Sequence, residues 1–128
     1  MEEGFAVKAL IIKAGKILLI RRSEKDELFP ETIDLPGGRL REGETSETGL
    51  AREVKEETGL EIEIIKATRR WTLSEKEVKL RGTTFYCKHL KGKVKLSKEH
   101  QGHEWVRPEE ILEGDYPEWL KEEIKKAL

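Results

Sequence analysis

The stretch GRLREGETSETGLAREVKEETGL, residues 38–60, decides the fold of this chain. It predicts a helix from Thr45 or Ser46 to Thr58. Either Thr45 or Ser46 can cap the first turn with its hydroxyl, and Gly59 can end the last turn in a left-handed conformation. The glycines before and after the helix indicate tight backbone turns at both of its ends.

The predicted helix carries a dense group of charges. Side chains three and four residues apart share a helix face, so Glu53, Glu56 and Glu57 are expected to project together, with Arg52 within reach of Glu56. Three carboxylates in one turn repel one another, and a divalent cation reverses that repulsion. Mg²⁺ prefers oxygen ligands and keeps waters that phosphate oxygens can replace. A solvated acidic face is the competing interpretation.

The flanking segments predict a mixed sheet covered by helices. Two apolar runs at residues 5–13 and 16–22, separated by Ala14-Gly15, are typical of a β-hairpin. Residues 23–34 are polar and contain a proline, so they predict an exposed loop. Further strands are expected at residues 60–73, 77–90 and 103–108, and helices at 108–114 and 117–128. The 128 residues suit a single domain of α+β class, residues 1–128.

The composition excludes several classes of protein. The formal net charge is −1 although 40% of the residues are charged, which argues against a nonspecific nucleic-acid binder. No apolar run approaches the roughly 18 residues that cross a bilayer, and residues 1–10 lack the features of a secretory signal. The lone Cys87 cannot form an internal disulfide, which favours a cytoplasmic location.

Amide side chains are scarce, since the chain has no asparagine and one glutamine, Gln101, among many lysines and glutamates. Proteins from hot environments avoid heat-labile amides and use many ion pairs. We therefore hypothesise a thermophilic source.

The spacing of the glycines and charged residues identifies a resemblance. Gly38, five residues, Glu44, seven residues and then REVKEETGL from residue 52 to 60 match the pattern GX5EX7REUXEEXGU, where U is a bulky aliphatic residue. This is the Nudix box, so the chain resembles the Nudix hydrolase superfamily; LLIRR, LPGG and HEWVRPEEI agree. The resemblance implies an α/β/α sandwich around a mixed sheet. It also implies hydrolysis of nucleoside diphosphate derivatives with Mg²⁺ or Mn²⁺.

The resemblance implies roles for the helix. Glu56 and Glu57 would be the principal metal ligands, and the carbonyl of Gly37 would add a backbone ligand. Glu53 would be the general base or orient the attacking water, and would share in metal binding. Arg52 would hold these carboxylates by ion pairing.

Further roles fall outside the helix. Glu44 would support the loop or a second metal. A last acidic ligand is expected before the EW strand, and Glu99 is preferred over Glu104. Gly38 would let the backbone approach metal and phosphates closely.

Substrate contacts are assigned by the same resemblance. Arg22 would contact a substrate phosphate, with plain surface charge as the competing interpretation. Leu35 would stack on the base, and Asp115 would replace the base-reading asparagine of bacterial MutT, which this chain lacks. Trp71 is expected either in the core or on a base-stacking wall, and Trp119 in the core.

The sequence leaves the substrate class open. The short chain, LLIRR and LPGG favour a MutT-type enzyme that converts a nucleoside triphosphate to a monophosphate and pyrophosphate. Residues 60–104 lack the proline typical of ADP-ribose pyrophosphatases, and the first tyrosine, Tyr86, comes late for a diadenosine-polyphosphate hydrolase. A non-catalytic nucleotide-binding regulator and an RNA 5′-end processing enzyme are also compatible with the fold. The expected partner is a small nucleotide, without membrane or stable nucleic acid; homodimers are frequent in the superfamily.

Overall fold

A computed structural model describes residues 2–26 and 31–128 of the chain. Within these residues, seven strands form one mixed sheet and three helices pack on it. The elements are β1 (Glu2–Lys13), β2 (Lys16–Arg22), β3 (Ile33–Asp34), β4 (Gly37–Arg39), α1 (Ser46–Thr58), β5 (Glu61–Glu75), β6 (Val78–Lys91), β7 (His100–Val106), α2 (Pro108–Glu113) and α3 (Glu118–Ala127).

Strand β1 lies at the centre of the sheet. The order is β3-β2-β1-β6-β5, with β4 added to β1 and β7 added to β2. Among the strand pairs of the described residues, only β1–β6 is parallel. The predicted hairpin is present, but β1 pairs with β2 only at Ile12↔Ile17 and Lys13↔Lys16. The same edge of β1 pairs with β4 nearer its start, so the two hairpin strands diverge.

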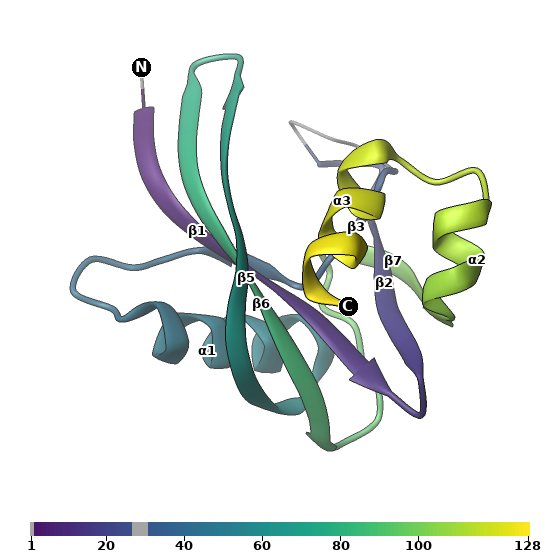
Figure 1. Cartoon of the computed structure of the whole chain (residues 1–128). Coiled ribbons are helices and arrows are strands. Elements are labelled where there is room, and N and C mark those ends of the chain that lie inside the picture. The colour runs from purple at the N-terminus through teal and green to yellow at the C-terminus, as the bar shows by residue number, and fades with distance from the viewer. Residues whose placement is uncertain (1, 27–30) are drawn as a thin grey trace.

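The sheet is covered on both faces (Figure 1). On one face Leu50 and Val54 of α1 pack against β1, β2 and β6. On the other face Leu120 and Ile124 of α3 pack against Leu10 and its neighbours, together with α2. Successive β1 residues alternate between these two clusters, because strand side chains point to opposite faces in turn. The α/β/α sandwich predicted above is confirmed.

The ends of α1 follow the sequence signals. Thr45 is the N-cap, since its side chain accepts a hydrogen bond from the backbone N–H of Thr48. Gly59 ends the helix with φ of 75°, which side-chain-bearing residues adopt at a cost. The choice between Thr45 and Ser46 as the cap is thereby resolved, because Ser46 is the first helical residue.

Two segments differ from the expected layout. The predicted loop at 23–34 ends in the short strand β3, which pairs with β2; residues 27–30 of that loop lie outside the described residues. Strands β5 and β6 form a long hairpin whose turn, with the start of β1, extends away from the helices (Figure 1). No helix formed by residues 2–26 and 31–128 combines the length and apolarity needed to cross a membrane.

Candidate active site

Arg52 organises the acidic residues of the α1 region. Its Nε and Nη2 donate to the two carboxylate oxygens of Glu44 at 2.6 and 2.9 Å. Its Nη1 donates to Oε1 of Glu53 at 3.0 Å and to Oε2 of Glu56 at 3.1 Å. The hydrogen bond from Arg52 is the main cause that lowers the pKa of Glu44 to about 2. Arg52 therefore connects the loop before α1 to two carboxylates on the helix.

Glu57 points the other way, into the protein. Its Oε1 accepts a hydrogen bond from the backbone N–H of Gly37 at 2.7 Å, and the side chain is buried. Burial raises the pKa of Glu57 to about 8, and the nearby ammonium of Lys8 opposes this rise. The buried His100 places its Nε2 3.9 Å from Oε2 of Glu57. The carboxylates of Glu53 and Glu57 both reach β4, at Gly38 and Gly37, whereas Glu56 is paired with Arg52.

Close backbone approach explains the two glycines of β4. A Cβ on Gly38 would lie 2.6 Å from Oε2 of Glu53, so only glycine leaves this carboxylate its position. Gly37 has φ of 149°, and a Cβ there would overlap the carbonyl oxygen of Val7. Burial is the main cause that raises the pKa of Glu53.

The structure distinguishes the two candidates for the further acidic residue. The backbone N–H of Ser97 donates to the carbonyl of Glu57, and that of Ser23 donates to the carbonyl of Glu99. The loop before β7 therefore passes the end of α1, and the charge of Glu99 contributes to the raised pKa of Glu53. Glu104 pairs with Leu19 on the opposite face of the sheet, beside the α2–α3 cluster.

The acidic residues fit a divalent cation by their chemistry. Glu53, Glu56, Glu57 and the carbonyl of Gly37 offer only oxygen donors, which hard cations prefer. Burial of Glu53 and Glu57 opposes their ionisation, and a cation beside them would favour it. Within residues 2–26 and 31–128, no three His, Cys, Asp or Glu side chains are arranged closely enough to hold a metal ion, and Glu53 and Glu56 are ion-paired with Arg52.

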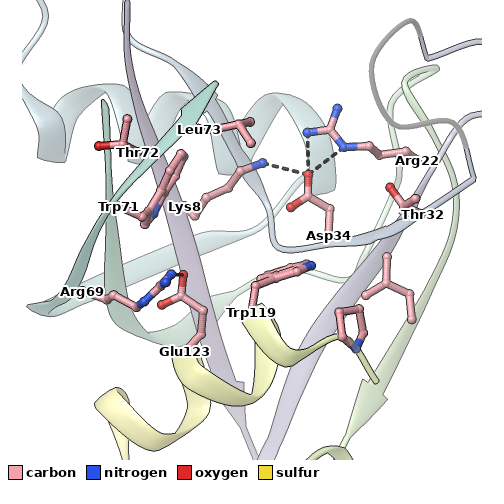
Figure 2. Close-up of a pocket in the computed structure, with 12 residues that line it drawn as sticks. Lys8, Arg22, Thr32, Asp34, Arg69, Trp71, Thr72, Leu73, Trp119 and Glu123 are labelled. Carbon is pink, nitrogen blue, oxygen red and sulfur yellow. Dashed lines mark hydrogen bonds and ion pairs between the residues drawn. The ribbon is translucent and has the colours of Figure 1, made fainter. Parts of the chain in front are cut away.

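A pocket of about 370 Å³ lies on the α3 face of the sheet (Figure 2). Trp71 of β5 and Trp119 of α3 contribute its aromatic surface, and Glu123 lines it between them. Lys8 of β1 lines its other side and is the strand partner of Gly37. Because the N–H of Gly37 also holds Glu57, the pocket and the acidic helix adjoin at β4.

Two cations of the pocket share one carboxylate. Lys8 Nζ lies 2.8 Å from Oδ2 of Asp34, and Nη2 of Arg22 lies 2.6 Å from the same oxygen. Arg22 also pairs with Asp26 at 2.8 Å. The ammonium of Lys8 and the guanidinium of Arg22 together hold the pKa of Asp34 below its ordinary value despite its burial. Lys8 and Arg22 are therefore ion-paired cations in the pocket wall, held by Asp34 and, for Arg22, also by Asp26.

Two expected side-chain positions, those of Leu35 and Trp119, do not match the structure, and a third residue, Asp115, lies outside the pocket wall. Leu35 is 1% exposed and packs in the α2–α3 cluster, so its side chain cannot stack on a base. Asp115 is exposed between α2 and α3 and is not part of the pocket wall. Trp119 was expected in the core, yet it is 38% exposed and lines the pocket. Trp71 lies on the pocket wall rather than in the core.

Lys8 and Glu123 were missed from the sequence. Lys8 interrupts an apolar strand, which is a weak signal for a functional cation. Glu123 gives a stronger one, since it falls within the helical row of Leu120, Ile124 and Ala127, all buried. A glutamate in an apolar row predicts a buried charge with a partner or a ligand.

The chain is similar to known proteins over most of its length. The NUDIX domain pattern matches residues 3–127. A MutT-like protein from Streptomyces ambofaciens is 36% identical over 99 residues, which span 77% of this chain but only 60% of that protein. Nucleoside triphosphatase NudI from Escherichia coli O17:K52:H18 is 30% identical over 127 residues, or 90% of this chain and 89% of that protein. The crystal structure of a MutT protein from Methanosarcina mazei Go1 has a TM-score of 0.89 and 32% identity, covering 98% of this chain and 93% of that one.

Proposed function

This chain belongs to the Nudix hydrolase family, and on that premise we propose that it hydrolyses nucleoside triphosphates to nucleoside monophosphates and pyrophosphate, with Mg²⁺ or Mn²⁺ as cofactor. One observation carries the choice of substrate. A pocket with two indoles, and with the cations Lys8 and Arg22 in its wall, adjoins the acidic helix through the Lys8–Gly37 strand pair. The aromatic groups suit the base, the cations suit the phosphates, and the acidic groups suit the metal ion of a metal-bound nucleotide.

The carboxylates of α1 would hold the cation and prepare the water. Glu56, Glu57 and the carbonyl of Gly37 would bind the ion, with Glu99 completing the site. A bound divalent ion neutralises the charge of the pyrophosphate bridge and lowers the pKa of a coordinated water. Glu53 would accept the proton of the attacking water at Oε2, because Arg52 already occupies its Oε1.

The supporting residues keep this base in place. Arg52 joins Glu53 to Glu44, and Glu44 also accepts a hydrogen bond from the backbone N–H of Arg41. Hydrogen bonds therefore connect the loop before α1 to the proposed base. Lys8 and Arg22 would bind the phosphates, and Asp34 would limit their motion before substrate arrives.

The proposal is tested by the products formed from a defined panel. Deoxynucleoside triphosphates, ADP-ribose, diadenosine tetraphosphate and triphosphorylated RNA are each incubated with Mg²⁺, and products are separated by anion exchange. We expect monophosphate and pyrophosphate from the triphosphates. Turnover of ADP-ribose or diadenosine tetraphosphate alone would favour those substrates instead, and no turnover of any compound would favour a non-catalytic regulator.

A pair of variants tests the role of Glu53. Glu53→Gln removes the proton acceptor but keeps the size of the side chain, so we expect hydrolysis to slow at least about 100-fold with the fold intact. Glu47→Gln removes an exposed carboxylate from the first turn of the same helix and serves as the matched control. Equal rates for the two variants would remove Glu53 from the mechanism.

Cytosolic location and thermophilic origin accompany the proposal as sequence-based hypotheses. The buried thiol of Cys87 and the absence of asparagine support them. A melting midpoint in the ordinary mesophilic range would count against the thermophilic origin.

A further inference from the structure

Glu123 is a buried carboxylate with one oxygen unused. Its Oε2 accepts hydrogen bonds from the hydroxyl of Thr84 at 2.6 Å and from Nη1 of Arg69 at 3.3 Å. Its Oε1 is buried and has no hydrogen-bond partner among residues 2–26 and 31–128. The residue is 3% exposed, and burial raises its pKa. An unpaired buried acceptor is costly, so it indicates a missing donor.

The surrounding groups fix which oxygen stays unused. Nε1 of Trp71 donates to the hydroxyl of Thr84 at 3.0 Å, so that hydroxyl turns its proton to Oε2 of Glu123. The indole of Trp71 lies directly against Gly82, where a Cβ would overlap it. Trp71, Thr84 and Glu123 therefore form one hydrogen-bonded relay that runs from β5 through β6 to α3.

This relay lies at the pocket that the proposed function assigns to the base (Figure 2). The exposed part of Trp119 and the ring of Trp71 provide surfaces on which a planar base can stack. The guanidinium of Arg69 lies next to the carboxylate of Glu123 and offers donors to a ring nitrogen or carbonyl. Arg69 and Glu123 therefore place a donor and an acceptor side by side in the pocket wall, and the unused oxygen of Glu123 lies just below the exposed surface.

We propose that Oε1 of Glu123 accepts a hydrogen bond from an amino group of the base, and that the enzyme therefore selects amino-bearing bases over thymine and uracil. The inference rests on the proposed function. Adenine, cytosine and guanine each present an amino group beside a ring nitrogen, which suits the Glu123–Arg69 pair. Thymine and uracil present carbonyl oxygens on both sides of their ring N–H, and these would face the carboxylate with like charge.

The test deletes the amino group from the substrate. ATP is compared with purine riboside triphosphate, and CTP with the triphosphate of 2-pyrimidinone riboside; each pair differs only in the exocyclic amine. We expect kcat/KM of the wild type to fall about 10-fold or more on loss of the amine. In Glu123→Gln the difference should shrink to within about threefold, and dTTP should gain relative to dATP, because the amide offers a donor where Oε1 stood.

Controls keep the outcomes distinct. Glu122→Gln changes the neighbouring, half-exposed glutamate of α3 and should retain the full wild-type preference. Melting curves report whether each variant folds. Nucleotide affinity is also measured by quenching of tryptophan fluorescence, so the comparison remains decisive without turnover. Equal use of amino and amino-free nucleotides by the wild type, or unchanged discrimination in Glu123→Gln, overturns the inference. Absence of hydrolysis with a clear amino preference in binding overturns the proposed function instead.

Discussion

Substituting Gly38 by alanine should displace Glu53 with little change to the fold. Gly38 lies in β4 without a positive φ, so alanine can adopt its backbone conformation. The new Cβ would lie 2.6 Å from Oε2, 2.7 Å from Cδ and 3.0 Å from Oε1 of Glu53. Rotation of the carboxylate does not relieve three close contacts at once. Ordinary contact begins at 3.4 Å, so the group must retreat by about 0.8 Å.

That displacement sets the expected rate loss. Moving a catalytic group by roughly 1 Å costs on the order of 100-fold in rate, equivalent to about 2.7 kcal/mol of transition-state stabilisation. We therefore expect kcat of Gly38→Ala to fall about 100-fold in a pyrophosphate-release assay with saturating Mg²⁺. The melting temperature should change by only a few degrees, because the end of a flexible side chain yields and alanine restricts the unfolded chain.

A matched glycine isolates the steric cause. A Cβ on Gly102 of β7 meets no atom within 4 Å, so Gly102→Ala should keep wild-type kcat. In the double variant Gly38→Ala/Glu53→Gln the two losses should not add, since both act on one carboxylate. A Gly38→Ala enzyme within about threefold of wild type, or fully additive losses, would refute the placement of the base beside Gly38.

Three further predictions concern charge, metal and the thiol. Asp34→Asn leaves Lys8 and Arg22 without their shared carboxylate and should reduce the free energy of unfolding by about 3 kcal/mol at pH 7. Because the pKa of Asp34 is lowered in the folded state, the stabilisation by Asp34 is complete above the ordinary carboxyl pKa and is lost as pH falls through the folded pKa. Urea titrations should therefore show that the difference in unfolding free energy between wild type and variant narrows in acid. A difference that stays constant with pH would contradict this. Removing divalent cations with EDTA should abolish hydrolysis, and excess Mg²⁺ should restore it. Mg²⁺ should also raise the melting temperature, because it relieves the repulsion between the carboxylates of α1. Activity that persists in EDTA would exclude a metal requirement. Burial raises the pKa of Cys87 to about 12, so Ellman's reagent at pH 8 should label it only in denaturant, and rapid labelling of the folded protein would contradict its burial.

The parts predicted correctly from sequence depend on local geometry. Thr45, Gly59 and the residues between them specify α1 through caps and helical spacing, which act within a few residues. Arg52 and Glu56 are one helical turn apart, so their ion pair also follows from the spacing. The grouping of the acidic residues was therefore accessible before the structure.

The parts that escaped prediction depend on strand register and helix docking. The proposed stacking surface combines Trp71 of β5, for which the sequence left core and stacking wall open, with Trp119 of α3, which was expected in the core. The two side chains meet only in the folded chain. Leu35 was misplaced because a turn that enters the core looks the same in sequence as one that lines a pocket. Glu57 turns inward because β4 inserts beside β1 and presents the N–H of Gly37, a long-range pairing that no local pattern shows.

The acidic helix and the aromatic pocket lie on opposite faces of the sheet, which has a consequence for evolution. The carboxylates of α1 do not line the aromatic pocket that includes Trp119 and Glu123 of α3. The two regions meet where Lys8 of β1 pairs with Gly37 of β4. Under the proposed function, mutations on α3 and β5 would change which nucleotide is accepted and leave the carboxylates of α1 in place. A library restricted to Arg69, Trp119 and Glu123 is thus the natural starting point for new substrate preferences on this scaffold.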